Sequence, residues 1–167
     1  QDMFRLLEEQ LDVAKTGGVS LLERVILVIR EVINDYALEY QRKISEESHS
    51  LEILCAVGNN CLRTCELVSH LSKTIDALLS QGQVSQLDLS SRFQNVAKQA
   101  GEKCGQAVFM DPGFGKLFSL LCDGDEWREG VATGSVLATL DDFLSDFRVW
   151  LDDYLLNILA TSMLIEC

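Results

Sequence analysis

The chain has 167 residues, of which 47% are hydrophobic and 24% are charged, and its formal net charge is −12. This length fits one domain or part of a larger protein, and the hydrophobic content is enough for a continuous core, which excludes a disordered chain. Lys and Arg side chains bind nucleic-acid phosphates and anionic membrane surfaces. The excess of acidic residues therefore argues against nucleic acid and membrane as direct partners, and it favours a partner protein with basic patches.

The first predicted element is an amphipathic helix over residues 2–15. Its apolar positions recur at intervals of three and four residues: Phe4, Leu7, Leu11 and Ala14. Gly17 and Gly18 follow, and glycine is the usual residue just past the end of a helix. A second helix is predicted from 19 to about 47, where isoleucines and tyrosines repeat with the same period.

Four further helices are predicted, over about 51–80, 87–110, 112–122 and 131–167. In the last of them the apolar stripe is Leu137, Leu140, Leu144, Phe147 and Leu151. No strand-like alternation lasts long enough to count, and a single proline leaves few places for turns. We therefore expect an all-α protein, an elongated antiparallel helical bundle or a rod of stacked helices over residues 1–167. Residues 1–82 would form its first helical group and residues 87–167 its second.

The ends of the chain add one expectation. It starts at Gln1, and it stops inside an apolar helical pattern at Met163–Cys167, without the glycine or polar residue that usually caps a helix. We expect a fragment of a longer protein.

The stretch Gly113-Phe114-Gly115-Lys116 raises the question of a phosphate-binding loop. Such a loop needs a longer glycine-rich run that ends in Lys-Ser or Lys-Thr and follows a buried strand, whereas here a leucine follows Lys116 and a predicted helix precedes it. Asp111 can accept hydrogen bonds from the first amides of a helix, and proline suits the first helical position. The stretch therefore predicts the start of a helix.

Six cysteines lie within apolar, periodic segments: Cys55, Cys61, Cys65, Cys104, Cys122 and Cys167. This placement is typical of buried free thiols in a reducing compartment. Cys61 and Cys65 share a helical face and could bind zinc, but no second spaced pair supplies the other ligands. The two histidines lie in polar sequence, so no nucleophile and base can be paired for catalysis. We expect no catalytic residue, no cofactor and no metal.

Two tryptophans and an acidic run are the candidate interface residues. Asp141, Asp142 and Asp146 lie on the last predicted helix, where a carboxylate cluster is usually a solvated face and less often a docking face for a basic partner. Trp127 and Trp150 are large amphipathic side chains, either of which could anchor an interface or pack within the bundle. The pair Asn59-Asn60 is either exposed or bonded through its amides to a neighbouring helix.

Three stretches together resemble the exocyst complex component 3 family. They are LEILCAVGNNCLRTCEL (51–67), NVAKQAGEKCGQAVFMDPGFGKLFSLL (95–121) and EWREGVATGSVLATLDDFLSDFRVWLDDYL (126–155), and the case rests on their order and spacing. The resemblance covers most of the chain and implies part of the C-terminal half of a helical rod.

The resemblance also implies a function. Members are non-catalytic subunits that hold secretory vesicles at the plasma membrane before SNARE-driven fusion, by binding other exocyst subunits and in some cases SNAREs and their regulators. It implies a cytoplasmic protein, peripheral at the plasma membrane or at vesicles, that meets membrane only indirectly and binds no nucleic acid. Two alternatives stay open: a paralogue that remodels membrane and actin outside the complex, and a helical zinc- or phosphate-binding protein that uses Cys61, Cys65 and Lys116.

Overall fold

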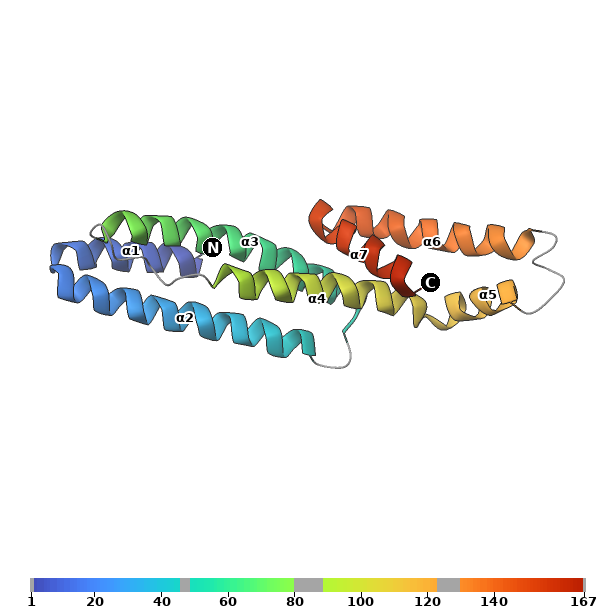
Figure 1. Ribbon diagram of the computed structural model, residues 1–167, viewed down its shortest axis with the longest axis horizontal. Helices are drawn as coiled ribbons and strands as arrows, with labels where there is room; N and C mark the ends of the chain where they lie inside the picture. The colour runs from blue at the N-terminus through green and yellow to red at the C-terminus, as the bar shows by residue number, and fades with distance from the viewer. Residues whose placement is uncertain (1, 46–48, 80–88, 123–129, 167) are drawn as a thin grey trace. The chain divides into compact units, whose positions relative to one another are not determined.

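The computed structural model describes residues 2–45, 49–79, 89–122 and 130–166 (Figure 1). Within these ranges every regular element is an α-helix, which confirms the predicted all-α class. The helices are α1 (Asp2–Thr16), α2 (Val19–Ser45), α3 (Leu51–Leu78), α4 (Ser90–Phe109), α5 (Pro112–Cys122), α6 (Val131–Trp150) and α7 (Asp153–Glu166). None of these helices is both long and apolar enough to cross a membrane.

The first five helices confirm the predicted ones, with ends that differ by a few residues. Helix α1 ends where Gly17 and Gly18 were expected to end it, and Gly18 takes a φ of 89°, which glycine adopts without strain. Helix α3 begins after Ser50, whose hydroxyl oxygen accepts a hydrogen bond from the amide of Ile53 at 3.4 Å. The loop predicted at 81–86 lies outside the described residues.

The prediction of one continuous helix over 131–167 is wrong. The chain leaves helical geometry at Leu151, which has an extended backbone with φ −107° and ψ 144°, and helix α7 starts at Asp153. The predicted apolar stripe of this region is confirmed at Phe147 and Leu151, which are buried, but it is wrong at Leu137, which is 61% exposed while the preceding Val136 is buried. No glycine or proline stands at this break; a residue of helix α3 and an aspartate that caps helix α7 bond the chain there, as described below.

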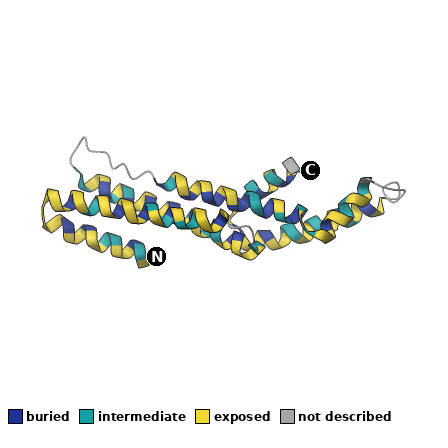
Figure 2. Cartoon of the chain, turned by 90° about the horizontal axis from the view of Figure 1, so that it is seen from below, coloured by how far each residue is buried: buried dark blue, intermediate teal, exposed yellow. Residues whose placement is uncertain are grey.

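The chain forms two compact units. The first comprises Gln1–Glu46 and Asn60–Val96, and the second comprises Glu47–Asn59 and Ala97–Cys167. Helices α3 and α4 therefore contribute residues to both. In the longer helices the buried residues recur along one side, as amphipathic helices require (Figure 2).

In the first unit, helix α1 packs against helix α2 (Figure 1), and the buried side chains come from four helices. Members of this core are Phe4, Leu11, Ala14, Leu22, Ile29, Ile33, Ala37, Ile44, Cys61, Cys65, Val68, Leu71, Ile75, Phe93 and Val96. An aromatic cluster adds to it. The rings of Tyr36 and Tyr40 lie 5.0 Å apart edge to face, and both rings contact the fully buried Phe93.

The second unit depends on small residues that let helices approach closely. A Cβ atom added at Gly58 of α3 would lie 2.8 Å from Leu155 Cδ1 of α7 and 3.3 Å from Ala100 Cβ of α4. At Gly101 of α4, an added Cβ would lie 3.1 Å from a methyl group of Ile158. Glycine at these two positions therefore permits a helix spacing that larger residues would prevent.

Candidate protein-interaction surface on helix α6

The predicted interface residues that the structure describes lie on the outer side of helix α6. Asp141, Asp142 and Asp146 are all exposed, and Trp150, the last residue of the helix, is 38% exposed. Asp142, Asp146 and Trp150 follow one another at intervals of four residues, so they share one face. We call these four residues the α6 surface. Trp127, the other predicted anchor, lies outside the described residues.

The end of helix α6, and with it Trp150, is held by Asn59 of helix α3. The Asn59 amide nitrogen Nδ2 donates to the Trp150 carbonyl oxygen at 2.6 Å. The Asn59 oxygen Oδ1 accepts from the backbone amide of Asp152 at 3.0 Å. One carboxamide therefore bonds the chain on both sides of Leu151, and it substitutes for the helical bonds that the break removes.

Helix α7 then begins with a cap of its own. The Asp152 carboxylate oxygen Oδ1 accepts from the amide of Tyr154 at 3.0 Å, and the Asp152 carbonyl accepts the first helical bond from Leu156 at 2.9 Å. The bond across to a neighbouring helix was one of two options that the sequence left open for Asn59. That this bond ends helix α6 was missed, because its two partners lie more than ninety residues further along the chain.

A surface pocket of about 320 Å³ lies beside Trp150. It is lined by Glu52, Cys55, Ala56, Asn59 and Trp150. Glu52 and Ala56 are exposed, whereas Cys55 is 2% exposed and forms the inner wall. The pocket is therefore lined both by Trp150 of the α6 surface and by the buried Cys55.

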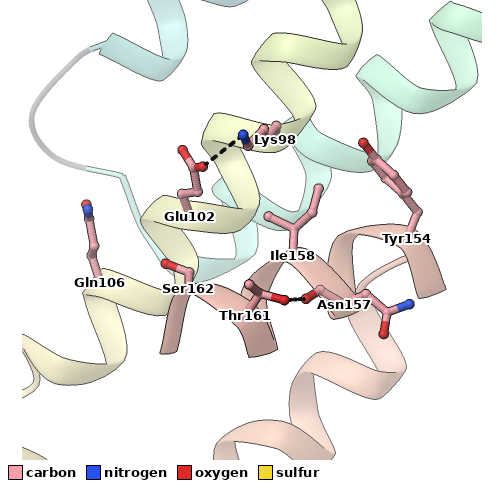
Figure 3. Close-up of a pocket in the computed structure, with 8 residues that line it drawn as sticks. All are labelled: Lys98, Glu102, Gln106, Tyr154, Asn157, Ile158, Thr161 and Ser162. Atoms are coloured by element: carbon pink, nitrogen blue, oxygen red, sulfur yellow. Dashed lines mark hydrogen bonds and ion pairs between the residues drawn. The ribbon is translucent and has the colours of Figure 1, made fainter. Parts of the chain in front are cut away.

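A second, larger pocket of about 460 Å³ lies between helices α4 and α7 (Figure 3). Its lining residues are Lys98, Glu102, Gln106, Tyr154, Asn157, Ile158, Thr161 and Ser162. The Lys98 ammonium group lies 3.7 Å from the Glu102 carboxylate, an exposed ion pair between residues one helical turn apart. The Thr161 hydroxyl donates to the carbonyl of Asn157 at 2.8 Å. This lining offers a contact surface that mixes charged, polar and apolar side chains.

The Gly-Phe-Gly-Lys stretch is the start of a helix, as predicted. The Asp111 carboxylate oxygen Oδ1 accepts hydrogen bonds at 2.9 Å from the amides of both Gly113 and Phe114, and Pro112 is the first residue of helix α5. These two amides are the groups that a phosphate would need, and they are already bonded. Lys116 is exposed on the next turn.

Cys61 and Cys65 are buried thiols of the first core, as predicted. Burial raises the pKa of Cys61 to about 12 and that of Cys65 to about 11. The Cys65 thiol donates to the Ser90 carbonyl at 3.3 Å. Across the described part of the chain, no three or more His, Cys, Asp or Glu side chains come together as a metal site would require.

The comparison with known proteins agrees with this helical structure. The family model described as "Exocyst complex component Sec6" matches residues 1–167. No solved structure matches the chain. Because the match covers the whole sequence, the chain belongs to the exocyst complex component Sec6 family.

Proposed function

We propose that this chain acts as a non-catalytic subunit of the exocyst that helps to tether secretory vesicles to the plasma membrane before SNARE-mediated fusion. The family match over residues 1–167 carries this proposal, because it identifies an exocyst component. The finer assignment, to component 3, rests on the three stretches at 51–67, 95–121 and 126–155. Other exocyst subunits are the expected direct partners, and SNAREs with their regulators are further expected partners. The expected location is cytoplasmic and peripheral at the plasma membrane or at vesicles.

The α6 surface is the part of this chain that we assign to partner binding. It combines three exposed carboxylates with a tryptophan that keeps more than a third of its surface accessible. Tryptophan is enriched among residues that dominate binding energy, and complementary charges around such a residue steer the partner. The partner surface is therefore expected to be basic around an apolar depression. Direct membrane binding is not expected, because an anionic headgroup layer would repel these carboxylates.

The test of this surface is a charge reversal in the full-length protein. The double variant Asp142→Lys/Asp146→Lys replaces two exposed carboxylates at i and i+4. The matched control is Glu31→Lys/Asp35→Lys, which reverses two exposed carboxylates with the same spacing on helix α2. Each variant is expressed with a tag in its own cells, and the exocyst subunits that co-purify are quantified.

We expect the α6 variant to weaken recovery of at least one exocyst subunit roughly tenfold, which corresponds to about 1.4 kcal/mol. The α2 control should retain normal recovery. If both variants recovered the same amounts of exocyst subunits, the α6 surface would not be a partner-binding surface, and the proposal that the protein is an exocyst subunit would be unaffected. Recovery of the tagged protein without exocyst subunits, even from the unmodified chain, would contradict the proposed function itself.

A further inference from the structure

Two buried thiols of the second unit face each other across helices α3 and α4. The sulfur atoms of Cys55 and Cys104 lie 3.9 Å apart, and the side chains are 2% and 0% exposed. In the described parts of the chain, Cys55, Cys61, Cys65 and Cys104 are free thiols. The proposed tethering function assigns no role to any of these four thiols, so the facing pair Cys55 and Cys104 calls for an explanation of its own.

The two helices are close enough at this level for a covalent link. One turn away from the pair, a Cβ atom placed on Gly58 would lie 3.3 Å from the Cβ atom of Ala100. Disulfides join Cβ atoms that are about 3.5–4.5 Å apart and bring the sulfurs to about 2.05 Å. The helices run antiparallel here, since Cys55 faces Cys104 while Gly58 faces Ala100. The two helices are therefore close at this level, and a disulfide requires the two sulfurs to move from 3.9 Å to about 2.05 Å apart.

The pocket beside Trp150 supplies the route by which a small reagent reaches this pair. Cys55 lines the pocket, whose outer wall includes the exposed residues Glu52 and Ala56. Its volume of about 320 Å³ exceeds what a molecule of the size of hydrogen peroxide needs. The pocket lining includes Cys55 and not Cys104, whose sulfur lies 3.9 Å from that of Cys55. The geometry thus makes Cys55 the thiol that is oxidised first and Cys104 the thiol that then closes the disulfide.

The electrostatics of the pair point the same way. The hydrogen bond from Cys104 lowers the pKa of Cys55, because it stabilises the thiolate form. The same hydrogen bond and burial raise the pKa of Cys104. Thiolate is the reactive form of cysteine, so the more acidic member is also the one at the pocket wall. The pKa values of Cys61 and Cys65 are raised by burial, which makes these two thiols poor competitors.

We propose that Cys55 and Cys104 form a redox pair that hydrogen peroxide converts to an intramolecular disulfide between helices α3 and α4. In the first step the Cys55 thiolate attacks one peroxide oxygen, the O–O bond breaks, and Cys55 becomes a sulfenic acid while hydroxide leaves. In the second step the Cys104 sulfur attacks Cys55 Sγ, the S–O bond breaks, and the hydroxyl group leaves as water after taking up the Cys104 proton. Overall, two thiols and one peroxide give one disulfide and two waters.

The consequence is a covalent link at a site next to Trp150. Oxidation fixes helix α3 to helix α4 within the second unit, and it removes the thiol that forms the inner wall of the pocket. This inference does not depend on the tethering function, since it rests only on the two cysteines and the pocket.

The experiment treats the purified full-length protein with a small molar excess of hydrogen peroxide, alkylates the remaining thiols and digests with trypsin. Cleavage after Lys43, Arg63, Lys103 and Lys116 gives peptides 44–63 and 104–116, which carry Cys55 and Cys104. The expected product is these two peptides joined, lighter by two hydrogens than their sum. Peptide 44–63 also contains Cys61, so fragmentation of the joined peptide must place the link on Cys55.

Matched variants decide which thiols act. Cys61→Ser should form the link as the unmodified protein does, whereas Cys55→Ser should reduce the linked fraction about tenfold or more. Cys104→Ser should accumulate the sulfenic acid at Cys55, which a dimedone adduct on peptide 44–63 reports. If circular dichroism shows that Cys55→Ser does not fold, the dimedone adduct of Cys104→Ser and the link formed in Cys61→Ser still show whether Cys55 is the thiol that reacts. Separate, fully alkylated peptides from the oxidised unmodified protein, or a link that persists in folded Cys55→Ser, would overturn the proposal.

Discussion

The substitution Asn59→Ala tests the physical cause of the break between helices α6 and α7. The Asn59 carboxamide makes two hydrogen bonds, to the Trp150 carbonyl at 2.6 Å and from the Asp152 amide at 3.0 Å. A typical hydrogen bond contributes a net ~1 kcal/mol, so removal of both should lower the free energy of unfolding by about 2 kcal/mol. Alanine adds no competing cost within helix α3, because it has the highest helix propensity.

The neighbouring residue offers a matched control. Asn60 lies on the same helix and is exposed, so Asn60→Ala changes the same chemical group without touching the break. Its effect on the free energy of unfolding should stay within ~0.5 kcal/mol, as surface substitutions usually do. Asn59→Asp adds a second comparison: it keeps the acceptor for the Asp152 amide, but it places a carboxylate oxygen against the Trp150 carbonyl oxygen. We expect it to destabilise more than alanine does.

Two measurements check these expectations. Urea unfolding, followed by circular dichroism, gives the free energy of unfolding for each variant. Hydrogen exchange at the backbone amide of Asp152 measures how strongly this amide is protected at the break. Asn59→Ala should speed this exchange roughly 30-fold, which corresponds to about 2 kcal/mol. If Asn59→Ala and Asn60→Ala had the same stability and the same exchange rate at Asp152, Asn59 would not be the residue that ends helix α6.

Three further predictions concern the two units. Gly58→Ala should lower the free energy of unfolding by about 1–3 kcal/mol in a urea titration, because the added Cβ atom would lie 2.8 Å from a leucine methyl group of α7. The control Gly134→Ala has open space around it and should instead raise the free energy of unfolding by up to ~1 kcal/mol. Equal effects of the two substitutions would refute the close packing at Gly58. Asp111→Ala should cost about 1 kcal/mol and speed amide exchange at the start of α5, whereas unchanged exchange would contradict the cap. The raised folded pKa values of Cys61 and Cys65, about 12 and 11 against an ordinary 9.0, mean that the unfolded chain releases these protons first. Their stabilising contribution is therefore complete below pH 9 and lost as the pH rises towards 11–12, so Cys61→Ala/Cys65→Ala should flatten the fall in melting temperature over that range; an unchanged slope would count against the burial of these thiols.

Much of the fold follows from local sequence. The period of three and four residues in helix α1, the glycines after it, and Asp111-Pro112 before helix α5 are signals within a few residues of the feature they specify. Each of these predictions was confirmed, because burial of one helix face and capping of helix ends are decided by neighbouring residues.

The features that were missed depend on distant residues. No glycine or proline stands at Leu151, so the apolar period favours one long helix; Asp152 caps helix α7 locally, but the bonds on both sides of Leu151 come from a carboxamide of helix α3. The exposure of Leu137 has a similar cause: Val136 and Leu137 are both apolar, and only the helices packed against α6 decide that Val136 is the one that is buried. The facing of Cys55 and Cys104 is likewise a tertiary contact, and the sequence showed only two cysteines in apolar stretches.

The candidate surface could be predicted only in part. The aspartates of α6 are exposed, as a solvated acidic face should be, and this exposure is also what a docking face requires. The sequence therefore identified residues that are available to a partner, while their role in binding stays a prediction that the charge-reversal experiment tests.

The measurement that tests the central claim most directly is affinity purification of the tagged full-length protein from its own cells, with quantitative mass spectrometry of the proteins recovered. The proposed function predicts the other exocyst subunits in amounts similar to the tagged protein itself. Recovery of the tagged protein alone, or with cytoskeletal and small-GTPase partners only, would contradict it and would favour a paralogue that acts outside the complex.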